Sequence, residues 1–380
     1  MQMKKLLGST LALSLFFPGS AANAAELLKN FKLSGQFDMQ ATAASNVTDF
    51  QTHPVTPAAA VTRNDRIGDA QTRVMLHMDW DLLDDVHSKV TLRKNDRNYG
   101  TPGFVNANTN ANSQVVSGVG GTGVLDQLYV DQAYLKIDKV FGSVDATMGR
   151  QFYGTSGDII AYYGPSDKAA YGLYSSAIDA LRADWAGEAV SLTGIVGKIT
   201  GHGVSAGSAT SDVDVRGLNA MFKGSEMWNG GAYLYNRVTH AVGAIGVNPQ
   251  AGSLGGKNDF LWVAGLKGKV TLGMAWLSTE FAKNFGENRN AGTGGNGSNS
   301  SKYTGWAAKF DLGAKMELGG IGAVSPWLHA AHGSGDGNTD GNTHTFTAIN
   351  PDYRPGSIYG RFGVAAGGAS VASGAGTNQA

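Results

Sequence analysis

Hydrophobic and polar residues alternate almost without exception between residues 31 and 42. One parity holds the apolar or small residues Phe31, Leu33, Gly35, Phe37, Met39 and Ala41, and the other holds Lys32, Ser34, Gln36, Asp38, Gln40 and Thr42. Because successive side chains of a strand point to opposite faces, this period of two predicts a strand with one apolar face and one wet face.

Similar segments recur along the chain, and the gaps between them are alternately long and short. The further predicted strands lie at residues 70–82, 88–95, 125–137, 143–152, 178–186, 189–199, 212–222, 231–238, 259–267, 269–282, 302–312, 322–332 and 356–366. Long polar connections occupy residues 44–69, 96–124, 153–177, 200–211, 239–258, 283–301 and 333–355, and tight ones occupy 84–85, 139–142 and 187–188. Strands of about ten residues with this rhythm are typical of outer-membrane β-barrels, whose long loops face the cell exterior.

The predicted fold is therefore all-β, a transmembrane antiparallel up-and-down β-barrel. A soluble β-sandwich also alternates apolar and polar residues, but it fills its apolar face with a tightly packed core. The residues expected to form the aromatic girdles of the barrel are Trp80, Tyr129, Trp185, Trp262, Trp276, Trp306 and Trp327. The predicted segments give about 14 strands. The chain has no terminal aromatic residue, and if closing strands are missing for this reason we expect about 16–18.

The N-terminus has the features of an export signal. Lys4 and Lys5 precede a short apolar run, and Ala22-Asn23-Ala24 supplies a small-x-small cleavage site. We expect residues 1–24 to be a signal peptide and residues 25–380 to form one barrel domain in the bacterial outer membrane. The chain contains no cysteine, which excludes disulfides and thiolate metal sites.

Composition and charge narrow the range of partners. The 55 glycines and 9 prolines suit many short strands and turns. The chain has 30 basic and 30 acidic residues, and loss of Lys4 and Lys5 with the signal leaves a slight negative balance. That balance argues against nucleic acid as a partner.

If the apolar parity faces lipid, the polar parity faces the lumen. A charge in lipid would cost roughly 2–4 kcal/mol near the midplane, so a hydrated interior suits these residues better. The residues predicted to line the pore are Arg73, His77, Asp79, Lys89, Arg93, Lys136, Arg150, Arg182, Asp184, Lys309 and Asp311. Either they solvate the channel and pair with one another, or their cations form a ladder for an anionic solute. Arg150 breaks the parity of its strand, and we expect a bulge at Gly149 to return it to the lumen.

The connection at residues 153–177 is rich in tyrosine. We expect it either to fold inward and narrow the pore or to be an ordinary surface loop. Its candidate constriction residues are Asp158, Tyr162, Tyr163 and Lys168, and the rings of Tyr162, Tyr163, Tyr171 and Tyr174 would stack on sugars.

Metal and catalytic signals are weak. Asp336, Asn338 and Asp340 have the spacing of a calcium loop, but Thr347 stands where such a loop needs glutamate, so we expect a polar turn and no cofactor. His329 and His332 share one predicted strand, yet residues i and i+3 of a strand face opposite ways. No nucleophile elbow occurs in the sequence, so we expect no catalytic residue and no enzymatic activity.

Four short motifs resemble the alginate-export family of outer-membrane barrels: VDQAYLK at 130–136, GRQFYG at 149–154, DIIAYYGP at 158–165 and GSGD at 333–336. The resemblance is loose and runs from about residue 31 to residue 360. It implies a monomeric barrel that passes a solute by passive diffusion, with a basic lumen where the solute is a polyuronate. The matching basic positions are Arg93, Lys136 and Arg150.

The predicted function is a porin for hydrophilic solutes, with export of an acidic polysaccharide such as alginate as its narrower form. A non-conducting scaffold or adhesin barrel remains open, and a barrel hydrolase is less favoured. The expected partners are outer-membrane lipid and lipopolysaccharide, the barrel-assembly machinery, and a small hydrophilic or polyanionic solute.

Overall fold

The structure, a computed structural model, describes part of the 380-residue chain. The described residues are 29–44, 67–98, 128–169, 172–200, 204–205, 208–209, 212–240, 258–288, 301–319, 322–335 and 340–353. The predicted signal peptide, the predicted strand at 356–366 and the residues Tyr171, Asp336 and Asn338 lie outside them. No helix in the described part is long and apolar enough to cross a membrane.

One antiparallel sheet contains all the long strands, each paired with its neighbours in sequence. Its strands are β1 (Lys29–Ala44), β2 (Ile67–Leu83), β3 (Val86–Asn98), β4 (Tyr129–Val140), β5 (Val144–Gln151), β8 (Ile178–Ala186), β9 (Val190–Thr200), β12 (Val213–Ser225), β13 (Trp228–Thr239), β14 (Asp259–Leu272), β15 (Ala275–Asn288), β17 (Trp306–Ala314) and β20 (Trp327–Gly333), with the short β16 (Ser301–Lys302) beside β15. The predicted all-β, up-and-down architecture is confirmed.

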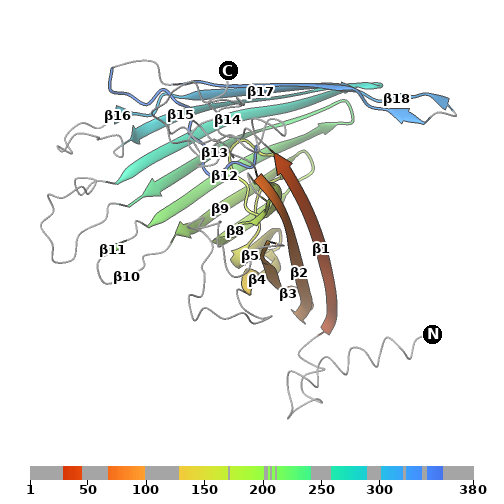
Figure 1. Cartoon of the computed structure of the whole chain (residues 1–380), viewed down its shortest axis with the longest axis vertical. Coiled ribbons are helices and arrows are strands. Elements are labelled where there is room, and N and C mark those ends of the chain that lie inside the picture. Colours follow the sequence, from red (N-terminus) through yellow and green to blue (C-terminus); the bar gives the residue numbers. More distant parts are fainter. Residues whose placement is uncertain are drawn as a thin grey trace, which may run out of the picture.

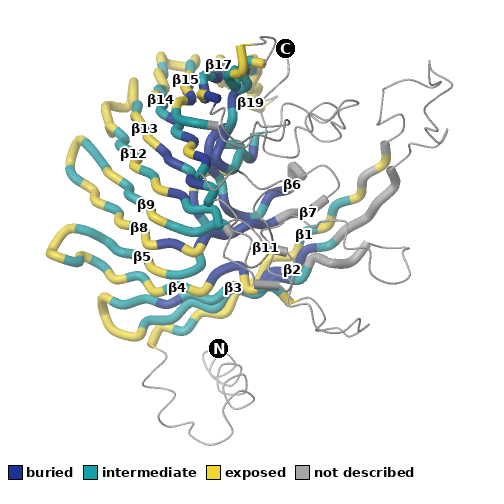
Figure 2. The backbone as a smooth tube through the Cα atoms, turned by 90° about the vertical axis from the view of Figure 1, so that its left-hand side faces the viewer, coloured by how far each residue is buried: buried dark blue, intermediate teal, exposed yellow. Residues whose placement is uncertain are grey.

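The sheet is curled, as Figures 1 and 2 show, and we call the space on its concave side the lumen. β1 and β20 stand at the two ends of its order, and each pairs with one described strand of the sheet. Three separate strand pairs accompany it: β6 (Pro165–Ala169) with β7 (Gly172–Ser175), β10 (Val204–Ser205) with β11 (Ser208–Ala209), and β18 (Met316–Glu317) with β19 (Ala323–Val324).

Tight turns join the strands at one end of the sheet, and the long connections lie at the other. The predicted strands at 302–312 and 322–332 are each divided, into β16 and β17 and into β19 and β20. The predicted division of residues 259–282 at residue 268 is also wrong. Gly268 instead stays in the ladder opposite Gly230 and Thr279. The turn forms at Gly273, whose positive φ of 59° suits a residue without a side chain.

The outer face of the curled sheet is apolar. Its exposed side chains include Leu33, Phe37, Met39, Val74, Leu76, Val130, Leu135, Met148, Leu181, Val196, Leu218, Leu234, Leu266, Phe281, Phe310 and Leu312. A continuous exposed apolar surface of this kind marks contact with lipid or with another protein. An apolar outer band around a polar interior is the architecture of outer-membrane barrels.

Three of the seven residues predicted to form aromatic girdles face the lumen instead. The Tyr129 ring lies 4.4 Å from the Arg93 guanidinium, and Trp276 lies 5.5 Å from the Lys269 ammonium. Trp327 packs edge-on against His329, with 5.9 Å between ring centroids. These side chains share the inner face with their partners, so the girdle prediction is wrong for Tyr129, Trp276 and Trp327.

Two inner-face tyrosines cover glycines on neighbouring strands. A Cβ atom added at Gly217 would lie 2.4 Å from ring carbons of Tyr235, and one added at Gly265 would lie 2.3 Å from Tyr233. Both tyrosines are buried in the apolar core inside the curl. The glycines therefore leave the space that the rings fill.

Replacing Gly217 by alanine is expected to destabilise the folded barrel by about 1–3 kcal/mol, because the Tyr235 ring must move out of a packed site. Urea unfolding in lipid vesicles, followed by gel mobility without heating, measures this change. Gly194→Ala is the matched control, since a Cβ at Gly194 meets no atom within 4 Å. Equal losses in the two variants would show that Tyr235 packing is not the cause.

Candidate functional site

The candidate site is the lumen, which two connecting segments enter. Residues 153–177 join β5 to β8, and residues 340–353 follow β20 in the chain. Figure 2 shows β6 and β7 of the first segment inside the curl of the sheet. Ile159, Ile160, Tyr163 and Phe346 of these segments are each no more than 1% exposed, so both segments are packed rather than free.

The first segment packs on one wall of the lumen through its apolar side chains. Ile159, Ile160 and Tyr163 belong to one cluster with the inner-face residues Ile178, Ile195, Val215, Tyr233, Tyr235, Leu261, Val263 and Ala282. Burial of an isoleucine side chain contributes roughly 1.5–3 kcal/mol. The apolar inner face of β8 to β15 therefore fixes this segment against the wall.

Backbone hydrogen bonds join the two segments to each other. The Tyr162 N–H donates to the Asn350 carbonyl at 2.8 Å, and the Ile349 N–H donates to the Ile160 carbonyl at 3.0 Å. The Asp352 N–H donates to the Asp158 carbonyl at 2.9 Å. The segments thus form one unit inside the lumen, although the sequence separates them widely.

The Asp352 carboxylate fastens this unit. It accepts hydrogen bonds from the Gly157 N–H at 2.8 Å, the Ser156 hydroxyl at 3.0 Å and the Ser166 hydroxyl at 2.6 Å. The Asp352 side chain belongs to the buried residues. Three donors satisfy a charge that burial alone would make costly.

The opposite wall holds the unit through two arginines. Arg73 of β2 pairs with Asp38 at 2.9 Å and donates to the Ser166 carbonyl at 3.1 Å. Arg93 of β3 donates through Nε to Asp131 of β4 at 2.8 Å, and Asp131 also accepts from the Ser175 hydroxyl at 2.7 Å. The unit is therefore fixed by apolar packing on one wall and by charged hydrogen bonds on the other.

Buried tyrosines add a polar link within the apolar wall. The hydroxyls of Tyr153 and Tyr235 lie 2.8 Å apart, and the Tyr233 hydroxyl donates to Glu280 at 2.8 Å. Burial raises the pKa of Tyr153, which lies in the connection after β5, so it stays neutral at ordinary pH. The Tyr153–Tyr235 bond fixes the start of the first segment to the inner face of β13, and the Tyr233–Glu280 bond joins β13 to β15.

Ten of the eleven predicted pore residues lie on the inner face. Most of them are paired there: Lys89 with Asp79 at 3.1 Å, Lys136 with Asp138 at 2.6 Å and with Asp145 at 3.1 Å, Arg182 with Asp184 at 2.7 Å, and Lys309 with Asp311 at 3.9 Å. His77 lies 2.9 Å from the Thr91 hydroxyl. The alternative in which the charges pair with one another matches this geometry better than a ladder of free cations.

The predicted lumen position of Arg150 is wrong. The pairing of β5 with β8 runs without a slip through Met148–Leu181, Gly149–Ala180 and Arg150–Asp179. Arg150 therefore shares the outer face with Met148 and pairs there with Asp179 at 3.2 Å. Gly149 has a positive φ of 123°, but it makes no bulge. Its missing side chain instead leaves room for the Ala133 carbonyl, which a Cβ would meet at 2.4 Å.

Three of the four predicted constriction residues, Asp158, Tyr162 and Tyr163, hold the segment through their contacts. Tyr163 is 1% exposed, which leaves no ring surface for a sugar. The Tyr162 hydroxyl donates to the Pro165 carbonyl at 2.7 Å, and the Asp158 carboxylate caps the Ile160 and Ala161 N–H groups. The side chains of Lys168 and Tyr174 lie outside the described part of the structure.

The weak calcium candidate is described only at Asp340. The Asn342 N–H and His344 hold the pKa of Asp340 down to about 2. Among the described residues, no three His, Cys, Asp or Glu side chains are grouped to hold a metal ion. The part of the candidate that the structure describes is a turn closed by its own hydrogen bonds.

His329 is the inward histidine of β20, but both of its ring nitrogens are occupied. Nδ1 contacts the Asp311 carboxylate, and Nε2 contacts the Tyr353 hydroxyl. Burial and the nearby Asp311 raise the pKa of Tyr353 to about 12. Neither nitrogen is left to activate a serine, so this group holds the end of the second segment.

Sequence reasoning did not identify three residues that organise the lumen: Asp131, Glu280 and Asp352. Asp131 has the parity of the outward Leu135 and Ile137, yet it faces inward because the pairing of β3 with β4 slips between Thr91 and Leu92. Glu280 lies in a strand with regular alternation of outward and inward residues, so its parity alone indicates that it faces the lumen. Asp352 lies in an irregular segment whose contacts no local pattern indicates.

Comparisons with known proteins give structural neighbours only. No family model and no curated protein sequence matches the chain. Among solved structures, the chain is similar to OccAB1 of Acinetobacter baumannii, with 10% identity, 81% of this chain and 82% of that chain covered, and a TM-score of 0.42. It is also similar to a porin, with 14% identity, 80% and 94% covered, and a TM-score of 0.33. OmpT of Vibrio cholerae has 10% identity, 82% and 90% covered, and a TM-score of 0.32.

Proposed function

We propose that this protein is a passive channel for small hydrophilic solutes in the bacterial outer membrane. The observation that carries the proposal is that the outer face of the sheet is apolar, whereas paired charges lie on the inner face beside the apolar wall that holds the inward segments. Two inward segments narrow that lumen. A wall of this kind places polar groups beside water and apolar groups beside lipid, which a conducting barrel requires.

The proposed channel discriminates weakly between anions and cations. Arg73 and Arg93 are each 4% exposed and paired, and the lysines and arginines farther along the wall stand beside carboxylates. A paired charge has little net field for an ion in transit. The solutes that suit such a lumen are neutral or zwitterionic molecules narrow enough to pass the two inward segments.

Export of an acidic polysaccharide is the narrower candidate. Lys267, Lys269 and Lys309 support it, because they lie on the inner face of β14 and β17 around the carboxylates of Glu280 and Asp311. The Lys267 ammonium lies 5.9 Å from the Tyr233 ring, so a cation and an aromatic face stand together there. The Tyr233 ring is buried, so the Lys267 ammonium is the group that the carboxylate of a sugar acid would meet there.

Single-channel recording of the refolded protein in a planar bilayer tests the proposal. We expect steady conductance with a reversal potential close to zero under a salt gradient. Absence of conductance from protein shown to be folded would contradict the channel and favour the scaffold barrel. Block by oligouronate added to one side would favour the polysaccharide candidate over the general channel.

Replacing Lys267, Lys269 and Lys309 together by glutamine is expected to shift the reversal potential toward cation preference, because Glu280 then loses its surrounding positive charge. The same recording measures the shift. Lys315→Gln is the control, since Lys315 pairs with Glu317 at the exposed tight-turn end of the sheet. If the triple variant keeps the parent's reversal potential, these lysines do not face the conducting path.

A further inference from the structure

Charged residues of alternating sign form a row on the outer face of four neighbouring strands. Arg150 of β5 is the cross-strand partner of Asp179 of β8, Asp179 is the partner of Lys198 of β9, and Lys198 is the partner of Asp214 of β12. Lys198 also contacts Asp214 at 3.0 Å and Asp212 at 3.2 Å. We call Arg150, Asp179, Lys198 and Asp214 the charged row.

The charged row lies at the end of the sheet that carries the long connections. β5 ends one residue after Arg150, and β12 begins one residue before Asp214. The next outward residues along β5, β8 and β9 are Met148, Leu181 and Val196, which are 60%, 54% and 58% exposed. The boundary between headgroups and acyl chains therefore falls between these two rows.

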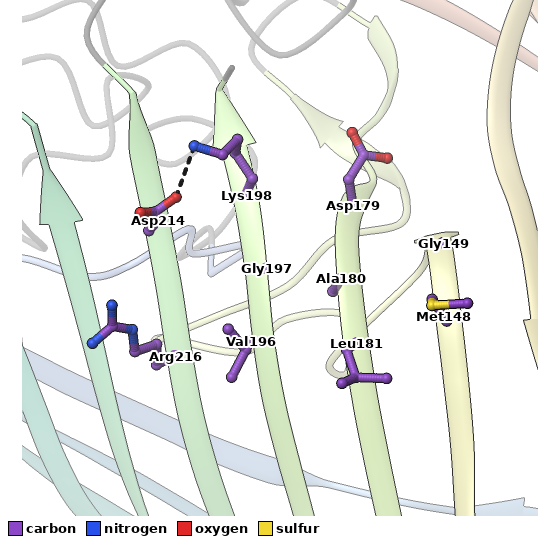
Figure 3. A pocket seen from close by; sticks show the side chains of 10 residues that line it. All are labelled: Met148, Gly149, Asp179, Ala180, Leu181, Val196, Gly197, Lys198, Asp214 and Arg216. Carbon is purple, nitrogen blue, oxygen red and sulfur yellow. Dashed lines mark ion pairs between the residues drawn. The ribbon is translucent and has the colours of Figure 1, made fainter. Parts of the chain in front are cut away.

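Arg216 stands in the apolar row instead of an apolar residue. It follows Asp214 by two positions on β12, and its cross-strand partners are Val196 and Asn236. Its side chain is exposed, and no carboxylate among the described residues pairs with it. Figure 3 shows Arg216 on the same face as Val196, Leu181 and Met148, below the Lys198–Asp214 ion pair.

An unpaired guanidinium in this row needs an anion from outside the protein. Arginine at lipid depth is costly unless its long side chain reaches the headgroup level or meets a counter-charge. Its planar fork of donors matches the oxygen pair of a phosphate or a carboxylate, and phosphate is the anionic group that membrane lipids share. Arg216 lines a hollow of about 410 Å³ on the outer face. Asp179, Lys198 and Asp214 of the charged row and the apolar residues Met148, Leu181 and Val196 also line it.

We propose that this hollow binds a phosphorylated, acylated glycolipid of the lipid A type from the outer leaflet. The phosphate lies against Arg216 below the charged row, and an acyl chain lies along Met148, Leu181 and Val196. The proposal rests on the membrane-spanning barrel proposed above but not on conduction. A barrel that conducts nothing in a phospholipid bilayer would still present this site.

Native mass spectrometry of the folded full chain in detergent tests the proposal with purified bisphosphorylated lipid A. Dephosphorylated lipid A and phosphatidylglycerol serve as the two comparison lipids. We expect the parent to retain bisphosphorylated lipid A best, and Arg216→Gln to bind it at least about tenfold more weakly, as for loss of a charge-assisted bond. Arg216→Lys keeps the charge and is expected to recover part of the binding.

Lys283→Gln is the matched control. Lys283 is another outward cation near the long connections, and its ammonium donates to the Thr304 carbonyl. We expect it to bind lipid A as the parent does. Equal binding of bisphosphorylated lipid A by the parent and by Arg216→Gln would overturn the site. If the parent retains phosphatidylglycerol as well as it retains bisphosphorylated lipid A, a glycolipid is not the specific occupant. If Arg216→Gln does not fold, Arg216→Lys is the deciding variant. Binding of lipid A by Arg216→Lys that is as strong as binding by Lys283→Gln would then overturn the site.

Discussion

Replacing Arg93 by alanine is expected to destabilise the folded barrel by about 3–5 kcal/mol, the largest loss for any single charge in the lumen. The Arg93 and Asp131 side chains are 5% and 4% exposed, so the variant leaves a buried carboxylate without its cation. The Tyr129 ring would lose its guanidinium partner at the same time. Urea titration of the vesicle-inserted protein measures the free energy of unfolding.

A double replacement separates the buried charge from the lost packing. Arg93→Met with Asp131→Leu removes both charges, and we expect it to recover most of the stability lost in Arg93→Ala. Lys29→Ala is the control, because its ion pair with Asp84 is exposed and such pairs contribute little. If Arg93→Ala lowers the free energy of unfolding by no more than Lys29→Ala does, water reaches the Asp131 carboxylate in the lumen.

Replacing Ile159 and Ile160 together by glutamate is expected to raise single-channel conductance severalfold. Both side chains are 1% exposed against an apolar wall, and two carboxylates there lack any compensating donor. The first segment would then leave the wall, while the ladder bonds of the sheet remain. Recording in planar bilayers measures the increase, and gel mobility without heating confirms that the barrel is folded.

The matched control for this variant places the same two charges at exposed positions. Phe141 and Met274 lie in tight turns and are 98% and 65% exposed. We expect Phe141→Glu with Met274→Glu to conduct as the parent does. Parent-like conductance from a folded Ile159→Glu, Ile160→Glu protein would mean that the first segment does not limit passage.

Most of the sheet follows from sequence because its determinants are local. The alternation of apolar and polar residues sets both the strands and the two faces, as at Leu33, Phe37 and Met39. Parity fails where the register slips, and no single residue marks that event. The bulge expected at Gly149 is absent because the pairing there is continuous, and no sequence feature indicates the slip between β3 and β4 that turns Asp131 inward.

The lumen is less predictable because its contacts join distant parts of the chain. The tyrosine-rich composition indicates an inward segment but not which tyrosine is buried. The prediction that the rings of Tyr162 and Tyr163 stack on sugars therefore rests on composition alone, and Tyr163 is buried. Arg93 has the correct parity for a lumen residue. Its role as an anchor depends on Asp131 and Ser175, which the sequence places far from it.

The link between Gly157 and Asp352 bears on the order of folding. These residues are 195 positions apart, and the Ser166–Asp352 bond spans 186. A contact that closes so long a loop is entropically costly until intervening strands have brought its ends together. We therefore expect the inward unit to form late, after the strands from β8 to β20 have paired with one another. We accordingly expect a newly inserted barrel to have a wider lumen until this unit has docked.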